Sequence, residues 1–127
     1  MKKSFLSSKI HKATVTDSHL DYEGSCEIDI SLLNAAGISV HEKIDIYNIT
    51  NGERFTTYAI EGKPETGNIC LNGACCHKAS IGDKVIICTY VDIDIKEIKN
   101  HKPKIIHVDD KNRILDSNNF DNVSLVE

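Results

Sequence analysis

The sequence lacks the features that would mark a membrane or nucleic-acid partner. Its longest apolar run, from Val85 to Cys88, falls far short of the about 20 residues that a membrane-spanning helix needs. It has no basic cluster, because its lysines and arginines are scattered and its net charge is −4. Proteins that bind nucleic acids or anionic membranes usually carry a basic face. We therefore expect neither nucleic acid nor membrane as a partner.

Signals for export and for metal binding are missing as well. The basic start of residues 1–12 is not followed by a sustained apolar segment or a small-residue cleavage site, so we expect a cytoplasmic protein. An odd number of cysteines in such a chain predicts reduced, mostly buried thiols. They are Cys26, Cys70, Cys75, Cys76 and Cys88. Because two adjacent cysteines cannot easily face one ion and no second Cys-x-x-Cys pair is present, no metal site is predicted.

Strand pattern, by contrast, is abundant. The length of 127 residues, with 40% apolar and 27% charged residues, is typical of one globular domain with a real core. Alternating β-branched residues predict strands at 9–16, 26–30, 43–49, 54–60, 68–71, 84–91 and 104–108. Helical pattern is confined to 31–37 and 73–79. Many short strands with few helices favour a closed β-barrel over 1–115, and the polar stretch 116–127 predicts a flexible tail.

The stretch YEGSCEID, residues 22–29, interrupts strand sequence with Gly24-Ser25. One interpretation is a bulge or tight turn, where glycine supplies a backbone angle that other residues avoid. The other is a nucleophile set against a peptide bond with no side chain in the way. The dipeptide alone leaves both interpretations open.

Several segments together are similar to one enzyme family. They are Ser8-Lys9-Ile10-His11, Tyr22-Glu23-Gly24-Ser25-Cys26, the block from Asn51 to Ile60, and Asn72-Gly73-Ala74. In this combination the chain resembles the aspartate 1-decarboxylases, from about Ser8 to Val91 and more weakly from 102 to 115. The resemblance implies a mainly β fold, the double-psi β-barrel with short helices, assembled as a homotetramer with active sites between subunits. It implies decarboxylation of L-aspartate to β-alanine and CO2, which feeds pantothenate and coenzyme A biosynthesis.

The resemblance also implies how the cofactor is made. Family members cut themselves at the Gly-Ser bond, here between Gly24 and Ser25, giving chains 1–24 and 25–127. Ser25 Oγ attacks the Gly24 carbonyl to form an ester, and elimination and hydrolysis then leave a pyruvoyl group at position 25. Thr57 is the implied donor to the developing oxyanion. The substrate amine forms an imine with the pyruvoyl group, so neither pyridoxal phosphate nor a metal is expected.

The remaining site residues carry over by position. Tyr58 matches the proton donor. Lys9 and Arg54 match cations for the two substrate carboxylates, although the sequence does not decide which cation holds which carboxylate. Substrate contacts are implied for Thr57, Asn72, Gly73 and Ala74, and supporting roles for His11 and Tyr22. His19, His41, His101 and His107 stay unassigned.

Two departures and one alternative accompany the resemblance. Cys26 follows the serine of the cleavage bond, and Cys75-Cys76 replace smaller residues. Some family members need an accessory factor to mature, so the resemblance allows a maturation factor as a further partner. The alternative is an uncleaved, non-catalytic barrel in which Gly24-Ser25 is only a bulge. The joint presence of Gly24-Ser25, Lys9, Arg54, Thr57 and Tyr58 argues against it, because a plain barrel has no reason to keep them together.

Overall fold

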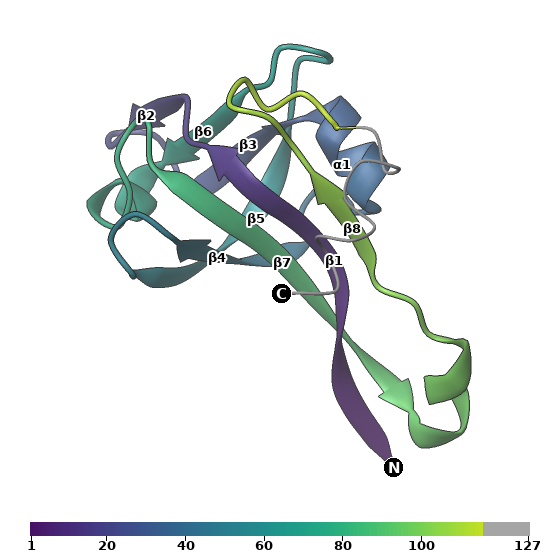
Figure 1. Cartoon of the computed structure of the whole chain (residues 1–127). Helices are drawn as coiled ribbons and strands as arrows, with labels where there is room; N and C mark the ends of the chain where they lie inside the picture. Colours follow the sequence, from purple (N-terminus) through teal and green to yellow (C-terminus); the bar gives the residue numbers. More distant parts are fainter. Residues whose placement is uncertain (116–127) are drawn as a thin grey trace.

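Strands dominate residues 1–115, the part of the chain that this computed structural model describes (Figure 1). The strands are β1 (Lys2–Thr14), β2 (Asp17–His19), β3 (Ser25–Asp29), β4 (Lys43–Asn48), β5 (Arg54–Gly62), β6 (Ile69–Asn72), β7 (Lys84–Asp94) and β8 (Lys104–His107). The helices are α1 (Ile30–Ala36) and two 3-10 helices, η1 (Gly73–His77) and η2 (Ile95–Asn100). The predicted flexible tail, 116–127, lies outside the described residues.

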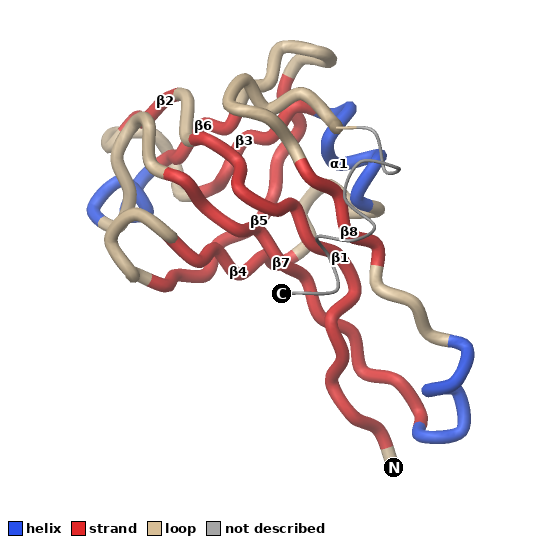
Figure 2. The backbone as a smooth tube through the Cα atoms, in the orientation of Figure 1, coloured by secondary structure: helices blue, strands red, loops and turns tan. Residues whose placement is uncertain are grey.

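One segment closes the sheet into a barrel. The strand order is β2-β6-β3-β5-β4-β7-β1-β8. Only Val15 and Thr16 separate β1, which pairs with β7, from β2, which pairs with β6 at the other end of the sheet. The Thr16 amide bridges the junction by donating to the Ile69 carbonyl at 2.8 Å. Residues 2–19 thus join both ends of the sheet, which wraps around a common interior (Figure 2).

The interior is filled by the inward-facing residues of each strand, as the pleat of a β-sheet requires. Ile10, Ile28, Ile44, Ile46, Ile69 and Ile87 are all fully buried there. Leu32 and Leu33 of α1 pack into the same core. These observations confirm the prediction of a mainly β barrel with short helices, as the resemblance to a double-psi β-barrel family implies.

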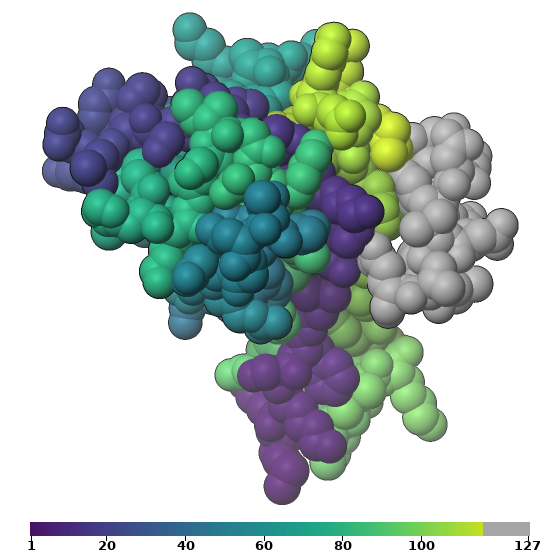
Figure 3. All heavy atoms as spheres, turned by 60° about the vertical axis from the view of Figure 1, so that its left-hand side comes forward, coloured from purple at the N-terminus to yellow at the C-terminus, as the bar shows by residue number. Residues whose placement is uncertain are grey.

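Most predicted elements are present, with three differences. All seven predicted strands occur, but β1 begins at Lys2 instead of residue 9, because its first residues pair with the end of β7. This two-stranded arm, with η2 at its tip, projects from the barrel (Figures 1 and 3). The helix predicted at 73–79 is a 3-10 helix that ends at His77. β2 and η2 were not predicted, since both are short and lack a periodic pattern.

Candidate active site

Ser25 opens β3, and its hydroxyl is held from the neighbouring strand. Ser25 pairs with Asn72 of β6 in the antiparallel register. The Asn72 Nδ2 donates a hydrogen bond of 2.9 Å to Ser25 Oγ, and the Cys70 thiol donates to Asn72 Oδ1 at 3.4 Å. Ser25 Oγ also lies 3.5 Å from the Glu23 carbonyl oxygen, to which it donates. The serine oxygen is thus fixed next to the peptide bond that precedes it.

The bulge interpretation of Gly24-Ser25 finds no support in the backbone. Gly24 is absent from the glycines with positive φ, and β3 pairs in unbroken register from Ser25 onward. A Cβ at Gly24 would meet nothing within 4 Å. Neither strand geometry nor crowding therefore requires a glycine here. Gly24 itself contributes no side chain beside its carbonyl.

Gly73 presses directly against this peptide. Its φ is +73°, and a Cβ at this position would lie 2.9 Å from Gly24 Cα and 3.0 Å from the Tyr22 carbonyl oxygen. Such distances are closer than real Cβ atoms approach backbone. Any other residue at 73 would both strain the backbone and displace Gly24. The start of η1 and the segment before Ser25 are therefore fitted to each other.

Tyr58 reaches the same place from β5. Cys26 pairs with Ala59 in a parallel register, and one further step places Ser25 beside Tyr58. Tyr58 is 39% exposed and lines a cavity of about 420 Å³. The lining consists of Tyr22, Glu23, Ser25, Glu27, Tyr58, Ile60 and Asn72. The cavity thus joins the serine, a phenol and an amide donor.

Thr57 precedes Tyr58 on β5 but is not among the residues that line this cavity. Its side chain alternates with that of Tyr58 and forms a hydrogen bond with the thiol of Cys75. Burial raises the pKa of Cys75, and the hydrogen bond from Thr57 offsets part of that rise. The hydroxyl of Thr57 therefore already has a neighbour in η1.

Cys26 cannot compete with Ser25 as a nucleophile. Its side chain alternates with that of Ser25 and is fully buried in the core. Burial is the main cause that raises the pKa of the Cys26 thiol far above its ordinary value, and the nearby Cys75 and Cys70 thiols add to the rise. Because the thiolate is the reactive form of cysteine, this thiol is inert.

The two expected cations lie elsewhere, on the outer face of β1, β7, β4 and β5. Lys9 is opposite Cys88 in the β1–β7 pair, and its charge acts on that thiol. Arg54 lies four residues before Tyr58, about 13 Å along β5, and its guanidinium stacks 4.5 Å above the Tyr47 ring. We call this surface, formed by Lys9, Cys88, Tyr90, Tyr47 and Arg54, the cation face.

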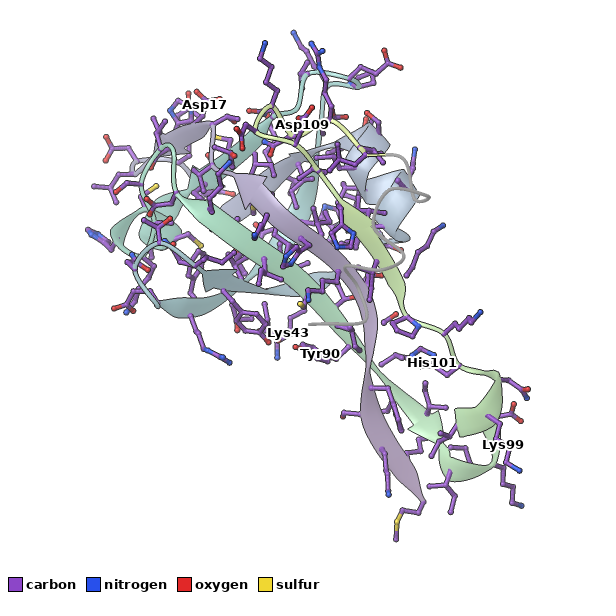
Figure 4. All side chains as sticks on the ribbon, in the orientation of Figure 1. Asp17, Lys43, Tyr90, Lys99, His101 and Asp109 are labelled. Atoms are coloured by element: carbon purple, nitrogen blue, oxygen red, sulfur yellow. The ribbon has the colours of Figure 1, made fainter. Side chains whose placement is uncertain are left out.

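Two tyrosines link the members of the cation face. The hydroxyls of Tyr47 and Tyr90 lie 2.6 Å apart. That hydrogen bond, together with desolvation, raises the pKa of Tyr90 well above its usual range, so it stays a neutral phenol. Tyr90 is labelled on the lower side of the barrel in Figure 4. Tyr47 thus supports Arg54 from below and is itself held by Tyr90.

The two residues expected to support the site, Tyr22 and His11, also lie in different regions. Tyr22 lines the cavity and stacks on the His19 ring with centroids 4.6 Å apart. His11 packs edge-on against the His107 ring, 5.2 Å away, between β1 and β8. The structure therefore brings Tyr22, Tyr58, Asn72 and Ser25 together, with Gly73 and Ala74 adjoining at η1. It leaves His11, Lys9 and Arg54 outside the cavity of the same chain.

The sequence-based interpretation missed two features of the cavity. Glu23 and Glu27 line it, so the described wall is acidic and contributes no lysine or arginine. Cys70 lies two residues before Asn72 on β6, and its thiol donates a hydrogen bond to the Asn72 side chain. The period of two in a strand would have set Cys70 and Asn72 on one face, but the contact with Ser25 depends on strand pairing.

Comparison with known proteins bears on this arrangement. Residues 1–115 match the family profile of aspartate decarboxylase. The chain belongs to the aspartate decarboxylase family. It is 54% identical over 114 residues to the aspartate 1-decarboxylase of Ralstonia nicotianae, covering 90% of this chain and 95% of that protein. The corresponding enzymes of Psychromonas ingrahamii and Caldicellulosiruptor bescii are 51% and 52% identical, over 91% and 87% of this chain and 91% and 86% of theirs.

The surroundings of Ser25 fit the pyruvoyl cofactor that this family implies. The hydroxyl of Ser25 is held by an amide donor, and the preceding residue, Gly24, has no side chain beside its carbonyl. Among residues 1–115, no group of three or more His, Cys, Asp or Glu side chains is arranged to hold a metal ion. No helix in the same residues is long and apolar enough to cross a membrane. All five cysteines are free thiols, and four of them are buried.

Proposed function

We propose that the Ser25 cavity decarboxylates L-aspartate to β-alanine and CO2 with a pyruvoyl group that the chain makes from Ser25. The family gives the reaction, and the assignment to these residues is our proposal. The observation that carries it is the 2.9 Å hydrogen bond from Asn72 Nδ2 to Ser25 Oγ beside the unhindered Gly24.

Self-cleavage follows from the chemistry of these groups. Ser25 Oγ attacks the Gly24 carbonyl carbon, the bond to the Ser25 nitrogen breaks, and an ester replaces the amide. Loss of the Ser25 Cα proton and breakage of the Cβ–Oγ bond release Gly24 as a carboxylate, ending chain 1–24. Hydrolysis of the remaining dehydroalanine frees ammonia and leaves chain 25–127 with its pyruvoyl head. The attack places charge on the Gly24 oxygen, for which Thr57, the neighbour of Tyr58 on β5, is the proposed donor.

Asn72 acts on the serine oxygen in both covalent steps. Negative charge grows on Oγ when its proton leaves and again when the Cβ–Oγ bond breaks. The amide hydrogen of Asn72 is aimed at this atom before the reaction begins. A preorganised donor of this kind stabilises the transition state more than water does.

Tyr58 is the proposed acid in the decarboxylation. The pyruvoyl group supplies an electron-withdrawing carbonyl that accepts the electrons released with CO2. The former α-carbon of the substrate must then gain a proton. Tyr58 lies next to residue 25 in the register and lines the same cavity, so its hydroxyl is within reach of that carbon.

Substrate binding requires a second chain. Aspartate carries two carboxylates, whereas the described lining of the cavity contributes Glu23 and Glu27 and no cation. Lys9 and Arg54 of the same chain are on the cation face, so a neighbouring subunit must offer them. This supports the homotetramer with active sites between subunits that the family resemblance implies. Arg54, with its planar guanidinium, suits the carboxylate that stays on the product.

The cellular setting follows from the reaction and from the thiols. β-Alanine feeds pantothenate and coenzyme A biosynthesis. Five free thiols are typical of a reducing compartment, which supports a cytoplasmic location. A maturation factor that accelerates the cleavage is compatible with this proposal and is not required by the chemistry.

The experiment is intact mass spectrometry of the purified full chain. We expect two fragments that separate between Gly24 and Ser25, with the larger one lighter by one ammonia than a serine-headed chain. Ser25→Ala should remain full length and inactive, because no hydroxyl is left to attack. Ser80→Ala, in an exposed turn, is the matched control and should cleave normally. Normal aspartate decarboxylation by Ser25→Ala would overturn the proposal.

Tyr58→Phe separates the two reactions. It should cleave at the parent rate, since the phenol takes no part in the attack of Ser25. Its kcat should fall by about 100-fold or more, the usual contribution of a general acid. Unchanged kcat would remove Tyr58 from the mechanism and leave the cleavage assignment intact.

A further inference from the structure

We infer that Cys70 is a positioning residue for self-cleavage. Its thiol orients the side-chain amide of Asn72 so that the NH2 group of the amide faces Ser25 Oγ. The inference rests on the proposed function. Its basis is a chain of two contacts, from the Cys70 thiol to Asn72 Oδ1 at 3.4 Å and from Asn72 Nδ2 to Ser25 Oγ at 2.9 Å. All three side chains are nearly excluded from solvent, so water competes little with these contacts.

An asparagine amide needs such a partner because its two ends have almost the same shape. A half-turn of the Asn72 amide would exchange Oδ1 and Nδ2 and present an acceptor to Ser25 Oγ. That orientation could not stabilise negative charge on the serine oxygen. Because the Cys70 thiol carries a hydrogen, it favours the orientation with Oδ1 toward itself. The NH2 group is then left for Ser25.

The surroundings of Cys70 keep its hydrogen in place. Burial raises the pKa of the thiol to about 11, and the carboxylates of Asp17 and Glu27 contribute to the rise. Asp17 lies directly opposite Cys70 in the β2–β6 pair. Glu27, opposite Cys70 in the β3–β6 pair, is itself fixed by a hydrogen bond from Asn68. A thiolate, which would attract the NH2 group and reverse the amide, is thus disfavoured at neutral pH.

The test compares Cys70 variants in the cleavage reaction. Full-length chain is made by cell-free translation, and the fraction cut between Gly24 and Ser25 is followed over time by intact mass. Cys70→Ala should cleave about threefold to tenfold more slowly than the parent, the effect of losing one modest hydrogen bond. Cys70→Ser, which keeps a donor, should restore the parent rate. A purely structural role for the thiol would not predict rescue by a hydroxyl.

Cys76→Ala is the matched control. Cys76 is a residue of η1, directly after β6, and its thiol donates to the Leu71 carbonyl at 3.3 Å instead of to Asn72. Its cleavage rate should match that of the parent. Cys70→Val fills the space without a donor and should be slow like Cys70→Ala, which keeps the test decisive if the alanine variant does not fold.

Each outcome separates this inference from the proposed function. A parent-like rate for Cys70→Ala or Cys70→Val, or a Cys70→Ser variant as slow as they are, would overturn the positioning role and leave the proposed function standing. A parent chain that never cleaves, either alone or with cell extract added as a source of a maturation factor, would overturn the proposed function and this inference with it.

Discussion

The Ser25 cavity and the cation face of one chain differ in what each can do alone. The cavity holds Ser25, the nucleophile of the proposed self-cleavage, and the Asn72 amide that donates to it. The cation face holds Lys9 and Arg54, the cations proposed to bind the substrate carboxylates, with Arg54 about 13 Å along β5 from Tyr58. Under the proposed function, one region therefore serves a reaction of the chain on itself, and the other a reaction of the assembly on a substrate.

Under the proposed function, maturation and turnover place separate demands on the same fold. Cleavage would depend on contacts between the neighbouring strands β3, β5 and β6, which form within a single chain. Turnover would depend in addition on how chains associate. Variants should consequently fall into two classes according to the region that they alter.

The largest effect is expected on the cation face. Arg54→Met should cleave normally, because Arg54 is remote from Ser25, but its kcat/KM for aspartate should fall by about 100-fold through loss of a bidentate charged contact. Co-expression with Ser25→Ala should restore activity. About a quarter of the sites in a random mixture would pair an intact Ser25 with an intact Arg54 from the next chain. Activity of the co-purified mixture is the measurement.

Separately purified and unmixed variants are the control for this restoration. A mixture no more active than the Arg54→Met protein alone would show that both residues serve one site within one chain. The cavity and the cation face of one chain would then act together.

A smaller effect is expected at the contact between η1 and the cleavage bond. Gly73→Ala should slow self-cleavage by about tenfold, because its Cβ would push against Gly24 and the left-handed backbone would be strained. Gly52→Ala is the matched control, since Gly52 has a φ of +79° but nothing within 4 Å of a Cβ. The cleavage time course by intact mass distinguishes them. Equal slowing in both variants would point to general backbone strain instead of the Gly24 contact.

The smallest effect concerns the far end of the strand that carries Ser25. Burial opposes ionisation of Asp29, but hydrogen bonds from Ser31, Gly67 and Glu65 outweigh it and lower its pKa. A lowered folded pKa stabilises the fold above the ordinary value near pH 4 and loses this effect as the pH falls through the folded value. Asp29→Asn should therefore reduce the free energy of unfolding at pH 7 by about 2 kcal/mol.

Urea unfolding between pH 7 and pH 3 measures this effect. The gap between the parent and Asp29→Asn should narrow as the solution becomes more acidic. Glu61→Gln, at an exposed position of β5, should show no such gap. A gap that stayed constant with pH would mean that the ionised carboxylate of Asp29 is not what stabilises α1 and its neighbouring loop.

Local pattern was enough to predict most of the barrel. In β4, for example, every second residue from Ile44 to Asn48 is buried, so the alternation is written into the sequence. The first residues of β1 could not be predicted in this way, because their order comes from pairing with Val91–Asp94 at the other end of the chain. The same holds for β2, a strand of three residues that exists only through β6.

The candidate site likewise has a part that local sequence pattern predicts and a part that strand pairing decides. Gly24-Ser25, Tyr58 and Asn72 could be singled out from motifs, and strand pairing brings them to one cavity. That Lys9 and Arg54 lie elsewhere follows from the order of strands, which no local pattern encodes. The contact of Cys70 with Asn72 could not be predicted either, because in the sequence a cysteine of a buried strand looks like any small apolar residue.

The segment that closes the barrel, residues 2–19, lies wholly on the amino-terminal side of Gly24. After the cut, β1 and β2 would remain wedged between β7, β8 and β6, with Ile10, Ala13 and Val15 still buried. The mature protein would be a complex of two polypeptides in which the smaller is a structural part of the larger. Maturation would turn the contacts of β1 and β2 with β6, β7 and β8 from contacts within one chain into a peptide–protein interface, and the peptide would stay bound.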